Sequence, residues 1–482
     1  MKYKTILVVI VVISIFIGAG SLTRGHEWGD DFAWYILQAK SILNGTTAEF
    51  MQQSEFTNTQ STTHVGPLAY PWGYPLILTP VYAVKGISPL ALKLPALFFY
   101  AGFLICLYYL IKIRLTRTES LLIVSLFAFN PMLLQFEDQI LSDFPFLFFS
   151  TLALLLMLKE DKRGTLDYIL IGISIFLTTF MRATGIFLLG SFLLIEFFKF
   201  LKNIKDWDMV KQIVLNSFIV VFVFAVLWIA NIFLFPSGGE SYLSQYAGLT
   251  FETIINSTVA YFNVFSCFLG EADGWRYLYY VLFIFFLLGA WIRRKEETIF
   301  IVFTALWMIV HITYPYWQGS RYIFPILPIF IYFTFQGMKT AINRLPEKYR
   351  LVGERTYYGF WTIIACIFLF TSSANAINNL RDDRAINGPF DQYSMQVYDY
   401  IKEKTPSDSV VVFFKPRVMV LMTGHNTIMS MECDRMLLGD YIAISKKVDE
   451  NQQIPYEQID GCNLPLDKVL ENRRFIVYEV QK

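Results

Sequence analysis

Two adjacent carboxylates, Asp30 and Asp31, are the residues whose type and spacing most directly suggest chemistry in this 482-residue chain. They follow an apolar run and open a segment with helical periodicity, where a helix N-terminus favours negative charge, so capping alone could account for one of them. Paired carboxylates can also act as a base unit, in which one removes a proton from a hydroxyl and the other orients it or raises its pKa. A divalent metal bridged by the pair is a further alternative. We predict that Asp30 and Asp31 are catalytic.

A second acidic group, Glu137, Asp138 and Asp143, follows the third apolar run. Asp143 precedes an apolar segment that opens near Pro145, so it could simply cap a helix. The group contains no basic residue, and we expect it to face the same side as Asp30. The acids would then line one cleft, with Glu137, Asp138 and Asp143 contributing to substrate binding.

Cations expected on that side are few. Arg182 lies between two closely spaced apolar runs, and Arg321, followed by Tyr322, lies at the start of another. Snorkelling to lipid phosphates could explain both arginines. They could equally hold the phosphate of a lipid-linked substrate, because a guanidinium forms bidentate contacts with phosphate. His64 and Tyr74 are weaker candidates for substrate contact, and the histidines show no metal-ligand spacing.

The elements that must position these residues are about eleven apolar runs, most of them close to the length a helix needs to cross a membrane. The ranges are roughly 5–21, 88–111, 118–136, 144–158, 166–181, 184–200, 212–235, 277–292, 298–315, 322–340 and 357–376. We interpret the first run as a retained helix rather than a cleaved signal, because Ser21 to Arg24 makes a poor cleavage site.

The loops between the runs alternate in charge. With a cytoplasmic N-terminus, about twenty cations lie on the cytoplasmic side against about six in the short loops opposite, as the positive-inside rule requires. The acidic groups and residues from about 377 onward then lie outside the cytoplasm. The composition, 55% hydrophobic and 16% charged with a net charge of +1, is typical of a polytopic membrane protein and gives no indication of nucleic-acid binding.

Three regions outside the runs are long. The loop of about 22–87 contains a predicted amphipathic helix on the membrane surface after Asp31, a polar stretch from Asn44 to Thr63, and an aromatic turn at 70–75. The loop of about 236–276 contains a predicted helix over 250–265. We divide the chain into a transmembrane domain, 1–376, and a small α/β domain, 377–482, which we interpret as accessory. Its Cys433 and Cys462 could form a disulfide or remain free thiols.

In this order, these features resemble the GT-C superfamily of membrane glycosyltransferases, in particular the protein mannosyltransferase and aminoarabinose transferase-like branch, which includes the dolichyl-phosphate-mannose-protein mannosyltransferases. The resemblance covers about residues 5–350. It rests on Asp30-Asp31 after the first run, the turn Tyr70-Pro71-Trp72-Gly73-Tyr74-Pro75, Ser142-Asp143 with Pro145, Arg182 before Gly185, and Arg321-Tyr322 with Pro325 and Pro328.

The resemblance implies an all-α membrane fold of GT-C architecture and inverting transfer of a sugar from a polyprenyl-phosphate donor to a hydroxyl of a glycan, lipid or protein. It also implies a site on the outer face, with Asp30 as base beside Asp31, and Arg182 and Arg321 neutralising the departing phosphate. The second acid is Asp31 where many relatives look to have Glu, which leaves the choice of base open. No cofactor is implied with certainty.

Two other classes of function stay open at this point. A transporter or flippase for a lipid-linked substrate would need ionisable residues at mid-membrane depth, whereas the acids here lie at the ends of the runs. A non-catalytic envelope assembly protein would depend on the C-terminal domain to bind a partner. Short loops and a compact tail favour a prokaryotic inner membrane, although Asn256-Ser257-Thr258 is a formal glycosylation sequon.

Overall fold

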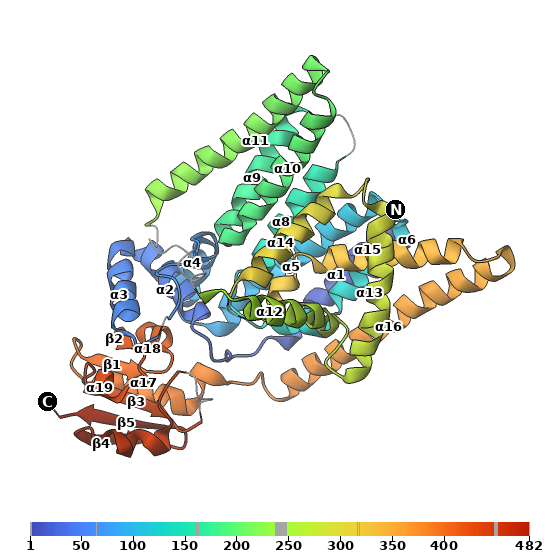
Figure 1. Cartoon of the computed structure of the whole chain (residues 1–482). Helices are drawn as coiled ribbons and strands as arrows, with labels where there is room; N and C mark the ends of the chain where they lie inside the picture. The colour runs from blue at the N-terminus through green and yellow to red at the C-terminus, as the bar shows by residue number, and fades with distance from the viewer. Residues whose placement is uncertain are drawn as a thin grey trace.

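The computed structural model describes residues 2–63, 65–159, 163–236, 248–315, 317, 319–447 and 452–481. A bundle of helices forms most of the chain, and a small α/β domain closes it (Figure 1). The helices of the bundle are α1 (Lys2–Ser21), α2 (Asp31–Asn44), α3 (Thr47–Gln60), α4 (Gly73–Lys85), α5 (Pro89–Lys112), α6 (Arg117–Ala128), α7 (Pro131–Glu137), α8 (Asp143–Leu158), α9 (Thr165–Met181), η1 (Ala183–Gly185), α10 (Ile186–Lys202), α11 (Trp207–Leu234), α12 (Phe251–Val264), η3 (Phe265–Phe268), α13 (Asp273–Arg293), α14 (Thr298–Thr313), η4 (Ser320–Ile323), α15 (Leu327–Asn343) and α16 (Glu347–Arg381).

The helices follow the predicted apolar runs, but fewer of them meet the length of a membrane span. Among the described residues, α1, α5, α11, α13, α16 and the continuous pair η1 and α10 are long and apolar enough to cross a membrane. Helices α6 and α7, which meet at a bend of 54°, would add one more. Because α8, α9 and α14 are apolar but shorter, the predicted number of eleven spans is not confirmed, whereas a polytopic membrane protein is.

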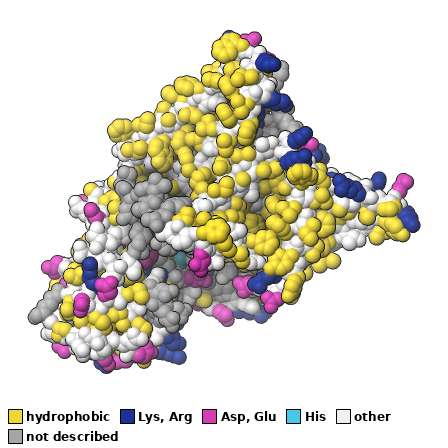
Figure 2. Space-filling view, viewed as in Figure 1, with side chains coloured by type: hydrophobic (Ala, Val, Ile, Leu, Met, Phe, Trp, Pro, Cys, Tyr) yellow, Lys and Arg dark blue, Asp and Glu magenta, His cyan; other side chains and the backbone are white. Residues whose placement is uncertain are grey.

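Basic side chains gather at the ends of the bundle that lie away from the C-terminal domain. Figure 2 shows them at the two helical tips, with hydrophobic side chains covering the surface between. The tips are the α10–α11 and α15–α16 connections, and the N-terminus also lies away from the C-terminal domain (Figure 1). This segregation agrees with the predicted topology, and the orientation across the membrane stays a prediction.

The first long loop folds differently from the prediction. Helix α2 forms over the predicted range, but it is an interior helix rather than a surface one, because residues 32–39 are all buried. Its buried Gln38 exchanges two hydrogen bonds with the backbone of Tyr70, at 2.9 and 3.1 Å, and so fixes the aromatic turn against the helix. The polar stretch after it is helical as α3, and the backbone N–H of Thr62 donates to the carbonyl of Met429 in the C-terminal domain.

The C-terminal domain is a small α/β unit, as predicted. Its elements are η5 (Gly388–Phe390), α17 (Gln392–Lys404), β1 (Val410–Phe413), α18 (Pro416–Thr423), β2 (Asn426–Ile428), α19 (Cys433–Met436), β3 (Tyr441–Ser445), η6 (Tyr456–Cys462), β4 (Leu466–Glu471) and β5 (Phe475–Val480). The five-stranded sheet has the order β2-β1-β3-β5-β4, in which β1 is parallel to β2 and β3, and β5 is antiparallel to β3 and β4. Cys433 and Cys462 form a disulfide. The boundary at 377 stays a prediction, and α16 runs past it to Arg381.

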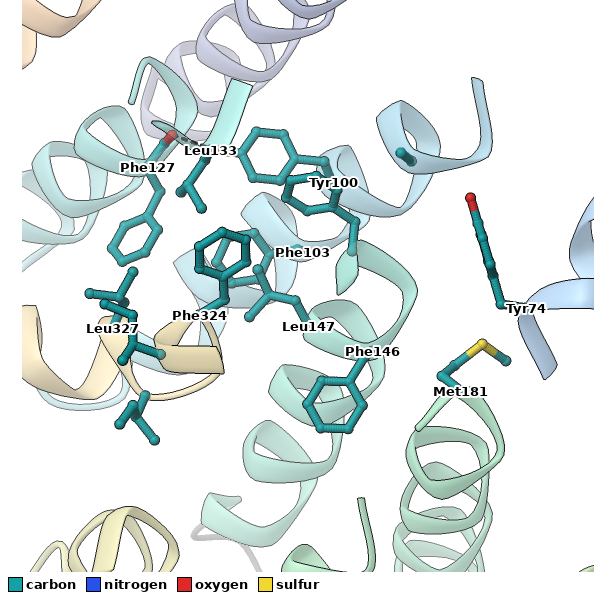
Figure 3. Close-up of a cluster of buried hydrophobic side chains, with 14 of the residues drawn as sticks. Tyr74, Tyr100, Phe103, Phe127, Leu133, Phe146, Leu147, Met181, Phe324 and Leu327 are labelled. Atoms are coloured by element: carbon teal, nitrogen blue, oxygen red, sulfur yellow. Dashed lines mark hydrogen bonds between the residues drawn. The ribbon is translucent and has the colours of Figure 1, made fainter. Parts of the chain in front are cut away.

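The larger of two hydrophobic clusters connects the bundle to this domain, and one part of it fixes the turn that carries Arg321. Side chains from α5 to α8 meet the segment before α15 around Phe324 (Figure 3). The Phe324 ring lies edge-on to Phe136, with centroids 5.0 Å apart. Because Phe324 is fully packed and follows η4 directly, the position of Arg321 is set by the core rather than by a free loop.

Candidate active site

The structure brings Asp31 and Arg321 together although they are far apart in the sequence. An Arg321 Nη donates to Asp31 Oδ2 at 3.1 Å, and the hydroxyl of Tyr70 donates to Asp31 Oδ1 at 2.6 Å. The Asp31 side chain is 32% exposed and that of Arg321 is 20% exposed, so the pair is partly buried. Both oxygens of Asp31 are therefore engaged by donors, and a bridging metal would have to displace them.

Arg182 forms a second pair beside the first. It donates to Asp143 Oδ2 at 2.8 Å and to the hydroxyl of Ser142 at 3.0 Å. Its guanidinium carbon and that of Arg321 each lie 5.3 Å from the centre of the Tyr322 ring. Ser142 occupies the N-cap position of α8, so Asp143 is not the helix cap that the sequence left open. The two predicted arginines, Tyr322 and two of the predicted acids thus form one cluster.

Tyrosines of the first long loop connect the two pairs. The hydroxyl of Tyr35 lies 3.0 Å from that of Ser142, and its ring packs on Tyr70 at 4.7 Å and Tyr74 at 5.0 Å between centroids. Tyr74 is fully buried, and its hydroxyl has no hydrogen-bond partner among the described residues. His64, the other loop residue predicted to contact substrate, lies outside the described residues.

Asp30 lies beside the C-terminal domain, whose Lys415 and Arg417 act on its charge. It occupies the N-cap position of α2, yet its side chain makes no capping hydrogen bond, so capping does not explain it. Its Oδ1 is buried and has no hydrogen-bond partner in the part of the chain that the structure describes. Burial raises the pKa of Asp30 to about 6, against the opposing charges of Lys415 and Arg417. Asp30 is therefore a carboxylate with a free oxygen and a pKa close to neutral.

Asp31 has the opposite electrostatic character. Burial acts to raise its pKa, but the charge of Arg321 and the hydrogen bond from Tyr70 outweigh that effect and hold the pKa below its ordinary value. Asp31 consequently stays ionised and paired at neutral pH. The two adjacent carboxylates are thus suited to different tasks, one to accepting a proton and the other to holding a cation.

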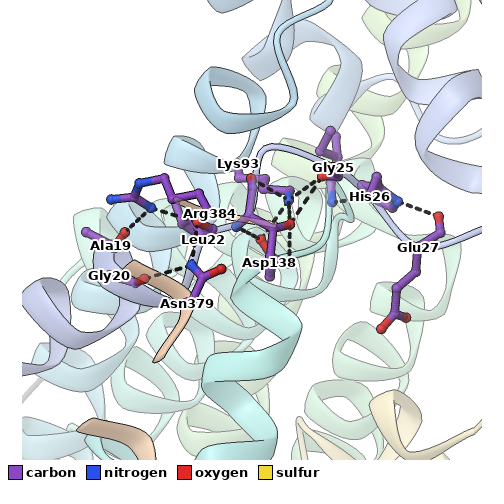
Figure 4. Close-up of polar contacts among 12 residues, drawn as sticks. Ala19, Gly20, Leu22, Gly25, His26, Glu27, Lys93, Asp138, Asn379 and Arg384 are labelled. Atoms are coloured by element: carbon purple, nitrogen blue, oxygen red, sulfur yellow. Dashed lines mark hydrogen bonds and ion pairs between the residues drawn. The ribbon is translucent and has the colours of Figure 1, made fainter. Parts of the chain in front are cut away.

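The rest of the second acidic group lies elsewhere. Asp138 pairs with Lys93 at 2.6 Å, and its two oxygens accept from the backbone N–H and the hydroxyl of Thr23 (Figure 4). Lys93, which is fully buried, also donates to the carbonyls of Thr23 and Gly25. Glu137 is buried against α1, with its Oε2 facing Gly18. Of this group, only Asp143 meets the arginines, and substrate roles for Glu137 and Asp138 stay predictions.

The Lys93–Asp138 pair leads to a prediction about stability. Asp138→Asn should lower the free energy of unfolding by about 2–3 kcal/mol, because it leaves a buried ammonium without its counter-ion, although the carbonyls of Thr23 and Gly25 remain as acceptors. Thermal unfolding of the purified protein in detergent measures this effect. Asp383→Asn is a matched control, since the carboxyl of Asp383 pairs with Arg24 but is 85% exposed. Equal melting temperatures for both variants would contradict the prediction.

A cavity of about 1030 Å³ opens beside the cluster. Arg321 and Asp138 lie in its wall, which α7, η3 and the end of α16 complete with apolar side chains such as Phe268 and Phe368 and polar ones such as Asn375. A wall that combines charged, polar and apolar side chains suits an amphipathic ligand. Among the described residues, no group of three His, Cys, Asp or Glu side chains converges as a metal site.

Sequence reasoning missed several members of this site. Tyr35 and Lys93, the buried partner of Asp138, were not singled out, and Arg417 from the C-terminal domain was not considered. Lys93 carried a usable signal, because a lysine in an apolar run requires a partner and the acidic pair 137–138 was available. The sequence around Arg417 gave no such signal, because Arg417 lies in a domain without any recognisable motif.

Comparison with known proteins defines the fold. No protein-family model matches the chain, and no curated protein matches it. Among solved structures, helical arrangements of the same kind occur in membrane glycosyltransferases of the GT-C class, and the chain has this fold.

Two such structures are similar over most of this chain. ArnT from Cupriavidus metallidurans in the apo state superposes with a TM-score of 0.58 at 11% identity, covering 99% of this chain and 98% of that one. The Archaeoglobus fulgidus oligosaccharyltransferase, tethered to an acceptor peptide, has a TM-score of 0.58 at 10% identity, covering 92% of this chain and 69% of that one. The predicted GT-C resemblance is therefore confirmed at the level of the fold.

Proposed function

We propose that this chain is an integral-membrane glycosyltransferase that moves a sugar from a polyprenyl-phosphate donor to a hydroxyl acceptor on the outer face of a membrane, with inversion at the anomeric carbon. One observation carries the proposal: Arg182 and Arg321 flank Tyr322, each paired with a carboxylate, and Arg321 lines a large cavity with mixed walls. A pair of neighbouring cations, one of them in the cavity wall, suits a phosphate that gains charge as it leaves.

The chemistry is a single displacement. The acceptor oxygen forms a bond to the anomeric carbon on the face opposite the phosphate, the bond between that carbon and the phosphate oxygen breaks, and the acceptor proton passes to a carboxylate. The phosphate departs on the polyprenyl chain, with Arg321 and Arg182 compensating its charge. No external oxidant or co-reactant is needed for this balance.

We assign the base to Asp30 and the holding of Arg321 to Asp31. Asp30 has an oxygen without a hydrogen-bond partner among the described residues, and its pKa of about 6 is close to neutral pH, where a general base with such a pKa is effective. Asp31 has both oxygens engaged and a lowered pKa, which makes it a weaker proton acceptor. This division favours Asp30 over Asp31 as the base, a choice that the sequence left open.

The donor is proposed to be lipid-linked because the cavity beside Arg321 has mixed walls within a membrane protein. Structures with the same fold have been determined for ArnT bound to undecaprenyl phosphate and for the Archaeoglobus oligosaccharyltransferase AglB with dolichol-phosphate and an inhibitory peptide. A glycan, lipid or protein hydroxyl would serve as acceptor. We propose a prokaryotic inner membrane, with the N-terminus cytoplasmic and the C-terminal domain outside.

The test is transfer of radiolabelled sugar from several polyprenyl-phosphate sugars in vesicles that carry the chain. Transfer to an added acceptor fraction by the intact protein, absent from empty vesicles, supports the proposal. Movement of the lipid-linked sugar across the bilayer without transfer would instead indicate a flippase. Absence of both, with specific capture of an envelope component, would indicate an assembly protein.

The pH dependence of transfer provides a further prediction. If Asp30 is the base, kcat/KM should fall on the acid side with an apparent pKa of about 6, because protonation removes the acceptor for the hydroxyl proton. Below that pH the rate should fall about tenfold for each pH unit. Rates measured from pH 4.5 to 8, with vesicle integrity checked at each pH, define the acid side of the profile. A flat profile down to pH 4.5 would exclude Asp30 as the base.

A further inference from the structure

The C-terminal domain inserts one arginine into the first long loop of the bundle. Arg417, on α18, is 1% exposed. Its guanidinium donates to the carbonyl of Pro67 at 2.7 Å and to the hydroxyl of Tyr70 at 3.1 Å, and it lies 4.7 Å from the centre of the Trp34 ring. The contacts all belong to the bundle, so Arg417 is enclosed by a domain other than its own.

The chain leaves room for this arginine. Gly66 has a φ of +129°, and a Cβ at that position would lie 2.8 Å from a guanidinium nitrogen of Arg417. A side chain at residue 66 would thus be strained and would also displace Arg417. Trp28 of the first long loop also joins the two domains, because its ring packs on Phe414 of the C-terminal domain with centroids 4.8 Å apart.

Among the described residues, the hydrogen bonds of Arg417 go to a carbonyl and a hydroxyl and not to a carboxylate, and its Nε has no hydrogen-bond partner. A buried cation without a direct counter-ion is costly. The acids that act on it are Asp30 and Asp31, through space rather than by contact. The positive charge of Arg417 therefore acts on Asp30 and Asp31. A residue that served only to join the two domains would not need a charge that acts on these acids.

The hydroxyl of Tyr70 transmits the position of Arg417 to the site. A guanidinium can only donate, so Tyr70 must accept from Arg417 and give its own single proton elsewhere. The acceptor is Asp31 Oδ1 at 2.6 Å, and Asp31 Oδ2 in turn accepts from Arg321 at 3.1 Å. One chain of oriented hydrogen bonds thus runs from the C-terminal domain to the cation at the cavity.

We propose that Arg417 is a positioning residue, and that the C-terminal domain completes the active site by fixing, through Tyr70, the orientation of the Asp31–Arg321 pair. This replaces the interpretation of the domain as an accessory. The inference rests on the proposed glycosyltransferase function, because it assigns Arg417 to the same site.

The test is a double-mutant cycle in the sugar-transfer assay with Arg417→Met, Tyr70→Phe and the double variant. Each single variant should lower kcat by about 10–100-fold while KM for the polyprenyl-phosphate sugar stays within about threefold, because orientation and not donor binding is lost. The double variant should be no slower than the worse single one, since both break one hydrogen-bond chain. Arg435→Met, which removes an exposed arginine from the same domain, is the matched control and should keep the wild-type rate.

The outcomes separate the two proposals. Additive losses, a loss confined to KM, or wild-type rates in Tyr70→Phe would overturn the positioning role while transfer by the intact chain upholds the proposed function. If Arg417→Met fails to fold, Tyr70→Phe decides, because it removes one hydroxyl and leaves the contact of Arg417 with Pro67 intact. Absence of transfer in the intact chain overturns the proposed function, and with it this inference.

Discussion

Asp30→Asn should lower kcat for sugar transfer by about 10³-fold, the largest single effect that we expect in this protein. The amide has nearly the shape of the carboxylate but cannot take the proton from the hydroxyl of the sugar acceptor. Removal of a general base typically slows a reaction by about 10²–10⁴-fold. Initial rates at saturating donor measure the effect. Asp408→Asn, at an exposed turn of the C-terminal domain, is the matched control and should retain full activity.

The same variant should not be less stable. The folded-state pKa of Asp30, about 6, lies above its ordinary value of 3.8, so the folded protein binds more protons between these values and its stability falls as the pH rises through this window. At pH 7–8 the ionised carboxylate therefore opposes folding, and Asp30→Asn should raise the melting temperature by about 1–3 °C. Inactivity accompanied by a lower melting temperature would point to a structural role instead.

Arg321→Ala should reduce kcat about 10²–10³-fold, because it removes the cation at the cavity rim that would neutralise the departing phosphate. It also leaves Asp31 without its counter-ion. Arg321→Lys should recover part of the rate, since it restores the charge but not the planar contact with carboxylate or phosphate. Donor-dependent rates for the three proteins measure both effects.

Arg276→Ala is the control for charge alone. Arg276 is 53% exposed, and its ion-pair partner among the described residues is Asp273 one turn away, so its loss should leave transfer unchanged. If Arg321→Ala and Arg276→Ala had equal rates, the role assigned to Arg321 would be wrong. If Arg321→Lys were no better than Arg321→Ala, bidentate geometry rather than charge would decide the rate.

The helical bundle and its class could be predicted from the sequence, because apolar runs of membrane length and alternating loop charge are local properties of the chain. The α/β character of the tail was equally visible, as in the run that forms β1 and the amphipathic segment that forms α17. The number of membrane spans could not be predicted, because α8, α9 and α14 are too short for length alone to decide whether they cross the membrane. Helix α2 was misjudged because its polar Gln38 bonds to the turn at Tyr70 instead of to water.

By itself, the sequence determined the types of residue in the site: carboxylates at the ends of apolar runs and the few arginines on the same side. It could not determine the pairing, because Asp31 and Arg321 are 290 residues apart and Tyr70 and Arg417 are 347 apart. Only the tertiary structure made Asp30 and Asp31 different, by burying one against the C-terminal domain and placing the other on a guanidinium. The pKa of a carboxyl is set by what packs around it, and neighbours distant in the sequence supply that packing.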